Sequence, residues 1–459
     1  MRKKVSPTLA GHSKTHVATN CAFCRNFHEF SIPDHLIEQL KERKVVVFAG
    51  AGVSTEARTV FPFTFYDEIH GDLRLGRHER PTFPALMTMF CKQPDGRRKL
   101  LEKLRSRFDY IETFPELLSA ATRFHNEIAT LFYVDTFITT NWDNYFERYC
   151  GATPFVTAED FAFWNVKGRK VFKIHGSVGN YGSVIATTED YRRAQRQLER
   201  GALGSALKML LSTRTILYVG YSFSDKDFIN IQQYIAREMK DVAPAAYIVS
   251  LEKSAEARFR AHGLIPIFTD AAHFVAVIKT HLEQDGCFLS ASRLQGVQRI
   301  LARVAAEHRR LFRHFDLKST PAIVYAAAYQ DGLAHAFERV LTMGHTGQYS
   351  HRCELTRQIH KYELIKKNNL QRRRYDDVAY VEGYVNGLFY LLLDDDTRKH
   401  LPLYFGFGMP ETRTLNQYKR VVARRGGGHK AAEALARSLV RKGFPKDELH
   451  HRPFLDWDD

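Results

Sequence analysis

Two groups of residues in this sequence are suited to chemistry, and each follows a run of hydrophobic residues. In the first group, Gly50 and Gly52 come directly after the apolar run at residues 45–48. Glycines there allow positive φ and let backbone N–H groups approach a ligand with no Cβ in the way. We expect this turn to cradle a diphosphate, with Ser54 or Thr55 capping the helix that follows. The alternative is an ordinary tight strand-to-helix turn.

The second group consists of an amide, a carboxylate and an imidazole. Asn141 and Asp143 close the segment TTNWD, and His175 follows the apolar run at residues 171–174. An amide both donates and accepts hydrogen bonds, and an imidazole with an unperturbed pKa of about 6.5 can accept a proton. Asn141 and His175 could therefore position a water or a hydroxyl and take its proton. In the alternative interpretation, Asn141 or Asp143 caps the next helix and the histidine is structural.

The elements that must position these residues alternate between strands and helices. We predict strands at residues 45–48, 135–143 with the polar end TTNWD, 171–176, 215–220, 245–250 and 264–268. This alternation predicts an α/β fold with a Rossmann-like, doubly wound parallel sheet. Ligands of open α/β sheets bind outside the carboxyl ends of the strands, where both groups of residues lie. The aromatic-rich stretch at residues 59–90 is expected to cover a bound ligand.

A change of pattern near residue 270 divides the chain, because the sequence after it is mostly helical. We predict an irregular segment at residues 1–32, the α/β domain at 33–285 and a mostly α-helical C-terminal domain at 286–459, which we expect to regulate the protein or to form its oligomer. In the C-terminal domain, apolar residues recur at helical spacing at Val378, Val381, Val385, Leu388, Phe389 and Leu392. They could form a self-assembly surface or a dock for a partner, or fill the core of their own domain.

The composition is that of a soluble globular protein, with 44% hydrophobic and 26% charged residues in 459. The sequence lacks an apolar stretch long enough to span a bilayer and an apolar signal-peptide core, which predicts a cytoplasmic protein without membrane contact. The net charge of +16 makes direct nucleic-acid binding possible. The basic residues are spread over several helical segments, so solvated helix faces are the favoured interpretation.

The first 32 residues contain cysteines and histidines, and CAFC has the spacing of half a zinc site. A structural zinc site usually has a second Cys pair, and none follows at that spacing. We therefore expect no metal, and we expect the six cysteines of the chain to be reduced thiols.

Four motifs in order, GAGVS, TTNWD, HG and GYSFSD, resemble those of the sirtuin-like NAD-binding family, over roughly residues 33–268. The resemblance implies that NAD is bound as substrate, with Asn141, Asp143 and His175 as the catalytic residues that line the nicotinamide-ribose pocket. The implied contacts to the diphosphate, to the adenosine half and to the rest of the dinucleotide come from Gly50, Ala51, Gly52, Ser54, Thr140, Gly220, Ser222 and Ser250.

The sequence departs from protein-deacylating sirtuins in two places. It has TEARTVFPFTFYDE where they carry Pro-Asp-Phe-Arg, and it lacks their zinc ribbon of two Cys pairs. It is similar instead to the zinc-free bacterial branch that hydrolyses NAD during phage defence. That resemblance implies hydrolysis of NAD to ADP-ribose and nicotinamide, depletion of cellular NAD in abortive infection, and silence until a trigger acts.

Two other functions stay open at this point. An NAD-dependent protein deacylase or ADP-ribosyltransferase would use the same asparagine and histidine. A non-catalytic module would bind NAD or ADP-ribose within an assembly. Related systems imply a homo-oligomer, with a hexameric helicase-type ATPase or a nucleic-acid-guided protein as a possible partner.

Overall fold

The computed structural model describes residues 23–57, 59–166, 168–221, 243–289, 293–294, 296–423 and 429–444. The chain divides into two compact units, Met1–His281 and Leu282–Asp459. None of the helices within these described ranges combines the length and the apolar character that a membrane crossing requires. The domain limits at residues 32 and 285 stay predictions.

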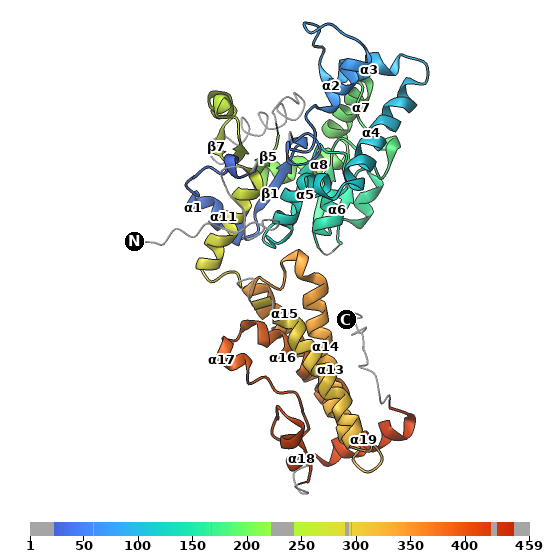
Figure 1. Cartoon of the computed structure of the whole chain (residues 1–459), viewed down its shortest axis with the longest axis vertical. Helices are drawn as coiled ribbons and strands as arrows, with labels where there is room; N and C mark the ends of the chain where they lie inside the picture. Colours follow the sequence, from blue (N-terminus) through green and yellow to red (C-terminus); the bar gives the residue numbers. More distant parts are fainter. Residues whose placement is uncertain are drawn as a thin grey trace. The chain divides into compact units, whose positions relative to one another are not determined.

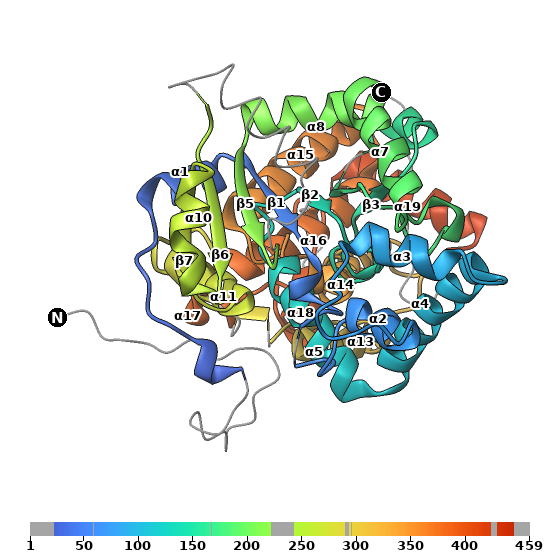
Figure 2. The ribbon, with the colours of Figure 1, turned by 90° about the horizontal axis from the view of Figure 1, so that it is seen from above.

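The described part of the first unit holds one sheet of seven parallel strands in the order β3-β4-β2-β1-β5-β6-β7, and Figure 2 shows the strands side by side. The strands are β1 Val45–Ala49, β2 Thr136–Thr139, β3 Thr153–Phe155, β4 Lys170–Lys173, β5 Thr215–Val219, β6 Ala246–Ser250 and β7 Leu264–Phe268. The predicted parallel sheet is confirmed. The short edge strand β3 was not predicted from the sequence.

Helices cover both faces of this sheet, as a doubly wound fold requires. On one face, Phe48 and Tyr218 belong to the same core cluster as Leu207. On the other face, the ring of Phe137 stacks on that of Phe146 at 4.5 Å. The helices of this unit that pack around the sheet are α1 Asp34–Lys41, α5 Pro115–Ala129, α6 Tyr145–Cys150, α7 Thr188–Arg200, α8 Ala202–Thr213, α10 Glu256–Ala261 and α11 Ala271–Gln284.

Three further helices fill the interval between β1 and α5. These are α2 Phe65–Asp72, α3 Phe83–Cys91 and α4 Gly96–Thr113 (Figure 1). Ile69, Leu86 and Leu104 are buried between them in a cluster that also includes Val184 and Ala186, which follow β4 in the chain. The aromatic-rich insertion is therefore a helical layer that packs against the loop after β4.

The described part of the second unit consists of helices joined by loops and isolated bridges, which confirms the predicted mostly α-helical C-terminal region. Its helices are α13 Val297–His314, α14 Ile323–Met343, α15 Arg352–Gln371, α16 Tyr375–Leu392, α17 Asp395–Arg398, α18 Leu415–Ala423 and α19 Lys430–Lys442 (Figure 1). Helices α14 and α16 cross so closely that a Cβ on Gly383 would lie 1.9 Å from the carbonyl oxygen of Tyr329. Both helices are buried on nearly all sides.

The apolar spacing on α16 forms core rather than an exposed face. Val378, Val381, Val385 and Leu388 are all buried in the main cluster of the second unit, and Leu392 packs against it. Phe389 alone of the six predicted residues is exposed, at 40%. The hypothesis that these residues form an assembly surface is therefore wrong, because α14 already covers them.

Candidate active site at the carboxyl ends of the strands

The glycine turn after β1 differs from the predicted strand-to-helix turn. A single short 3₁₀ turn at Ala51–Val53 follows the strand, and the next α-helix begins only at Phe65. Neither Ser54 nor Thr55 caps a helix there, so that prediction was wrong. Gly50 has a φ of −103°, so it does not use positive φ either.

The glycines at this turn let two loops interlock. A Cβ on Gly50 would lie 2.5 Å from the carbonyl oxygen of Gly220, and a Cβ on Gly220 would lie 2.5 Å from the nitrogen of Val53. Gly220 itself has a φ of +57°, which favours glycine. The N–H groups of Gly50 and Gly52 donate to the carbonyls of Val219 and Gly220 at 2.9 and 3.1 Å. The GAGVS loop is therefore hydrogen-bonded to the end of β5, where the GYSFSD motif begins.

Three buried polar side chains meet beside this turn. The Ser54 hydroxyl donates to the Asp143 carboxylate at 2.9 Å, and the Asn141 amide donates to the Ser54 hydroxyl at 3.2 Å. All three are almost fully buried. The structure thus brings together a residue of the GAGVS motif and two residues of the TTNWD motif, which lie far apart in the sequence.

The Asn141 side chain is held in one orientation, in which its amide oxygen has no hydrogen-bond partner within the described residues. Its amide nitrogen also donates to the carbonyl of Gly50 at 3.2 Å, and a carbonyl can only accept. The nitrogen must therefore face Gly50, which fixes the position of the oxygen. The amide oxygen Oδ1 is buried and has no hydrogen-bond partner within the described residues. An unpaired buried acceptor costs about 1–3 kcal/mol, so it is suited to receive a donor from a ligand.

Asp143 also has a structural role at the start of α6, although the N-cap residue of that helix is Asn144 and not Asn141 or Asp143. Its second carboxylate oxygen accepts the N–H of Tyr145 at 3.2 Å, at the first residue of α6. Its backbone carbonyl accepts a hydrogen bond from the ammonium group of Lys173, which pairs with Glu147 at 2.9 Å. The buried Lys173 was not identified from the sequence, although a lysine between Phe172 and Ile174 at the end of a buried strand was a usable signal.

His175 is attached to the same turn through its backbone. Its carbonyl accepts hydrogen bonds from the Trp142 indole N–H at 2.9 Å and from the N–H of Ile185 at 3.0 Å. Its half-buried ring lies 5.1 Å from the ring of Tyr191 on α7. The next residue, Gly176, has a φ of +85°, so the HG dipeptide requires glycine at its second position.

The remaining predicted contact residues lie at the ends of the central strands. Thr140 is half-buried and its N–H donates to the last carbonyl of β1 at 3.3 Å. Ala51 and Gly52 are at least partly exposed on the glycine turn. Ser250 ends β6, where its hydroxyl accepts a backbone N–H two residues later at 3.1 Å. Ser222 lies outside the described residues.

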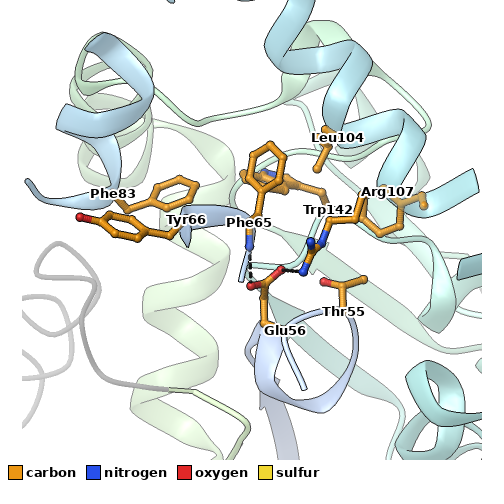
Figure 3. A pocket seen from close by; sticks show the side chains of 9 residues that line it. Thr55, Glu56, Phe65, Tyr66, Phe83, Leu104, Arg107 and Trp142 are labelled. Carbon is orange, nitrogen blue, oxygen red and sulfur yellow. Dashed lines mark hydrogen bonds and ion pairs between the residues drawn. The ribbon is translucent and has the colours of Figure 1, made fainter. Parts of the chain in front are cut away.

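An aromatic cavity adjoins the buried polar cluster, because Trp142 lies between Asn141 and Asp143 in the chain and lines it. The rings of Phe65 and Phe83 lie 6.1 and 6.0 Å from that of Trp142. Figure 3 shows these side chains, and the cavity has a volume of about 160 Å³. Its lining residues are Thr55, Glu56, Phe65, Tyr66, Phe83, Leu104, Arg107, Phe108 and Trp142.

An ion pair lies among these aromatic rings. The Glu56 carboxylate accepts the Phe65 N–H at 3.0 Å and a guanidinium N–H of Arg107 at 3.3 Å (Figure 3). Arg107 is 6% exposed and also donates to the carbonyl of Phe63 at 2.9 Å. Burial raises the pKa of Glu56, and the Arg107 charge opposes that rise. This pair joins the glycine turn to α2 and α4, and it was not identified from the sequence.

Metal ligands are not grouped in the part of the chain that the structure describes. No set of three or more histidine, cysteine, aspartate or glutamate side chains there is arranged to hold an ion. Cys21, His12 and His16 of the N-terminal segment lie outside the described residues, as does the side chain of Cys24.

Comparisons with known proteins show what parts of this chain are similar to. Residues 135–267 match the family model described as a SIR2-like domain. The chain is 25% identical over 197 residues to NAD(+) hydrolase ThsA of Cytobacillus dafuensis. The aligned residues make up 42% of this chain and 38% of the relative. It is 26% identical over 198 residues to NAD(+) hydrolase ThsA of Acinetobacter baumannii (strain 532279), covering 42% and 39% of the two chains.

A third relative is Defense-associated sirtuin 2 of Bacillus subtilis, 22% identical over 233 residues, covering 48% of this chain and 22% of the relative. The chain therefore spans less than half the length of these three relatives. The family match and the relatives confirm the resemblance predicted from the four motifs: residues 135–267 are similar to a SIR2-like domain, and the chain is similar to proteins named NAD(+) hydrolase ThsA and Defense-associated sirtuin 2.

Proposed function

We propose that this protein hydrolyses NAD+ to nicotinamide and ADP-ribose. The observation that supports this most directly is the unpaired, buried Oδ1 of Asn141, whose orientation is fixed by the Gly50 carbonyl. A preorganised acceptor of this kind can hold a water or a ribose hydroxyl without reorganising during the reaction. The relatives named NAD(+) hydrolase support the choice of substrate.

In the proposed reaction, a water oxygen attacks C1′ of the nicotinamide ribose. The bond between C1′ and the nicotinamide nitrogen breaks, and its electron pair leaves with neutral nicotinamide. Asn141 Oδ1 accepts a hydrogen bond from the water, and the His175 imidazole takes the proton that the water loses. The buried Asp143 carboxylate stabilises the positive charge that develops on the ribose.

We further propose that the dinucleotide lies across the ends of β1, β5 and β6. The N–H groups of Gly50 and Gly52 already donate to protein carbonyls, so these glycines shape the turn rather than donate to phosphate. The remaining proposed contacts to the diphosphate and adenosine come from Ala51, Ser54, Thr140, Gly220, Ser222 and Ser250.

The proposal is tested by measuring nicotinamide release from NAD+ with Asn141→Ala and His175→Ala. Each variant should lose at least about 100-fold in rate, because each removes a group that acts in the transition state. The matched controls are Asn144→Ala, whose side chain makes no capping bond, and His78→Ala, which is exposed. Full activity in Asn141→Ala and His175→Ala would refute the assignment. Consumption of NAD+ only with an acetylated peptide would favour a deacylase.

We also propose that this activity serves defence by depleting cellular NAD in the cytoplasm, in a homo-oligomer that stays silent until triggered. The relative named Defense-associated sirtuin 2 supports the defence role. A hexameric helicase-type ATPase or a nucleic-acid-guided protein would be a suitable partner. Cellular NAD measured through a phage infection should fall in cells with the wild-type chain and stay constant with Asn141→Ala.

A further inference from the structure

We propose that helix α13 of the second unit (Figure 1) binds the phosphate backbone of a nucleic acid through arginines on its exposed face. The group recognised is the phosphodiester chain, which single strands and duplexes share. The arginines are Arg299, Arg303, Arg309, Arg310 and Arg313. None of the four motifs contains them, and the proposed hydrolysis of NAD+ uses no residue of the second unit.

The five arginines lie on the face of α13 that points away from its own core. An α-helix has about 3.6 residues per turn, which places all five on the side opposite the buried residues. Each of the five is exposed. The structure describes the whole of α13, and none of its large apolar side chains is exposed. A helix that lies on a membrane needs such side chains beside its basic ones, so this face suits an anion in water. The buried residues are Val297, Ile300, Val304, Glu307, His308 and Leu311.

Four of these charges have no acidic side chain close to them. Arg310 pairs with Glu307 at 2.7 Å, and the buried Glu307 also accepts a hydrogen bond from the Tyr404 hydroxyl. The other four arginines form no ion pair with a carboxylate among the residues that the structure describes. Four positive charges are therefore available to an anion from outside the chain.

The arginine-rich helix α7 shows the opposite arrangement. Glu189 pairs with Arg192 at 2.6 Å and with Arg196 at 3.7 Å. Asp190 pairs with Arg193 at 2.9 Å. Both acidic residues lie in the first turn of α7, whereas the first turn of α13 has no acidic residue. The charges on α7 are thus compensated within the helix, as on a solvated face, and those on α13 are not.

The pattern on α13 does not serve the stability of the helix itself. Arg299 lies in the first turn, where the partial positive charge of the helix end disfavours a cation. Like charges four residues apart repel each other, and two such pairs occur, Arg299 with Arg303 and Arg309 with Arg313. Arg313, in the last turn, is placed favourably. An anionic chain laid along the helix would relieve the repulsion.

The row of arginines suits a regular row of phosphates. From Arg299 to Arg313 the helix rises about 21 Å. That length corresponds to about six nucleotides along one strand of a duplex. A guanidinium group binds phosphate oxygens with two parallel N–H donors, and α13 carries no lysine. Contacts to the backbone carry no information about base sequence, so binding should depend strongly on salt and little on sequence.

The experiment measures binding of the full chain to fluorescein-labelled probes by fluorescence anisotropy over a series of salt concentrations. The probes are single-stranded DNA, single-stranded RNA and duplex DNA, each about 20 nucleotides long and so longer than α13 can cover. At least one probe should bind with a Kd of about 100 μM or tighter at about 0.1 M salt.

The test variant carries four substitutions on α13, Arg299→Gln, Arg303→Gln, Arg309→Gln and Arg313→Gln. Its affinity should fall at least about tenfold, because four phosphate contacts are lost, and the slope of log K against log salt concentration should become shallower by about 3. The variant should unfold at or above the wild-type midpoint temperature, since it removes two like-charge pairs.

A matched control removes the same charge from exposed arginines that are paired with glutamates. It carries Arg192→Gln, Arg196→Gln, Arg258→Gln and Arg260→Gln, on α7 and α10. Its affinity should stay within about threefold of wild type, because charges more than about 10 Å from the bound chain are largely screened at 0.1 M salt.

Several results would overturn the inference. Equal weakening in both variants would show an effect of net charge alone. Unchanged binding in the α13 variant, or no binding of any probe by the full chain, would exclude a site on α13. Polyglutamate that competes as well as unlabelled DNA would indicate an acidic protein as the partner, and binding to anionic phospholipid vesicles alone would indicate a membrane. None of these results bears on NAD+ hydrolysis, which Asn141→Ala and His175→Ala test separately.

Discussion

Two charged side chains beneath the candidate site, Lys173 and Glu147, form an ion pair. Lys173 has no exposed side-chain surface, and its ammonium group bonds both the Asp143 carbonyl and the Glu147 carboxylate. A buried ion pair needs further hydrogen bonds to offset its desolvation. The Asp143 carbonyl supplies one to Lys173, whereas Oε2 of Glu147 has no hydrogen-bond partner within the described residues. Burial still raises the pKa of Glu147. The turn that holds Asn141 and Asp143 is therefore fixed before any ligand binds.

His125 makes stability depend on pH. It is fully buried between the rings of Tyr145 and Phe146, and burial lowers its pKa to about 4. In the unfolded chain the imidazole titrates at about 6.5, so below that pH the unfolded state binds more protons than the folded state. The free energy of unfolding should therefore fall by about 2 kcal/mol between about pH 7 and about pH 4.5 through this residue.

Urea denaturation at the two pH values checks this prediction. His125→Phe keeps an aromatic ring among aromatic neighbours and should remove about 2 kcal/mol of the pH dependence. The exposed His78→Ala should keep the wild-type dependence. An unchanged dependence in His125→Phe would show that other groups cause it.

At the scale of elements, the site depends on two loops that interlock at their backbones. The loop after β1 and the loop after β5 approach so closely that only hydrogen fits on Gly50 and on Gly220. The parallel pairing of Ala49 with Val219 brings both loops to the same edge of the sheet. A change in one loop is therefore transmitted to the other without any ligand.

Gly220→Ala tests this interlock. The new Cβ would lie 2.5 Å from the Val53 nitrogen, on a residue with a φ of +57°. Backbone strain costs about 1–2 kcal/mol and overpacking about 1–3 kcal/mol more, so we expect a loss of about 2–5 kcal/mol in the free energy of unfolding. Gly263→Ala is the matched control, with a φ of +74° and open space around it, and it should lose only the strain. If thermal denaturation showed the same loss of unfolding free energy in Gly220→Ala and Gly263→Ala, the interlock would be contradicted.

At the scale of the whole molecule, each of the two units has hydrophobic core clusters of its own among the residues that the structure describes. The core cluster of the second unit joins α13, α14, α16 and α19, whereas the clusters of the first unit lie around the sheet and between α2, α3 and α4. Glycines at the crossing of α14 and α16 set the spacing in the second unit. Each unit is therefore expected to unfold as its own cooperative transition.

Calorimetry of the full chain should resolve two unfolding transitions. Gly383→Ala places a Cβ 1.9 Å from the Tyr329 carbonyl oxygen. It should therefore lower the midpoint temperature of the second unit's transition by several degrees and leave that of the first unit unchanged. Gly220→Ala should lower the midpoint temperature of the first unit's transition alone. Gly344→Ala, at the end of α14 with nothing within 4 Å, should change neither by more than about a degree. One transition that shifts with every variant would refute this independence.

Local patterns determined most of the fold. The runs of β-branched and aromatic residues at β1, β5 and β6 predict buried strands because both sheet faces are covered. β3 could not be predicted, because its three residues include a proline and become a strand only by pairing with β4. The position of Asn141 and His175 near strand ends could also be predicted from the sequence. The carboxyl ends of parallel strands lie at the same edge of a sheet, so residues that follow different strands are brought to one edge.

Contacts between distant segments were decided only in the tertiary structure. Ser54 was predicted to cap a helix, but its hydroxyl donates a hydrogen bond to Asp143, which lies 89 residues further along the chain. The Glu56–Arg107 pair joins residues 51 positions apart on a turn and a helix. The aromatic cavity gathers its rings from α2, α3 and the TTNWD turn. The physical reason is that periodicity and turn chemistry are local, whereas a side chain's partner depends on which buried polar group lies beside it after the chain has folded.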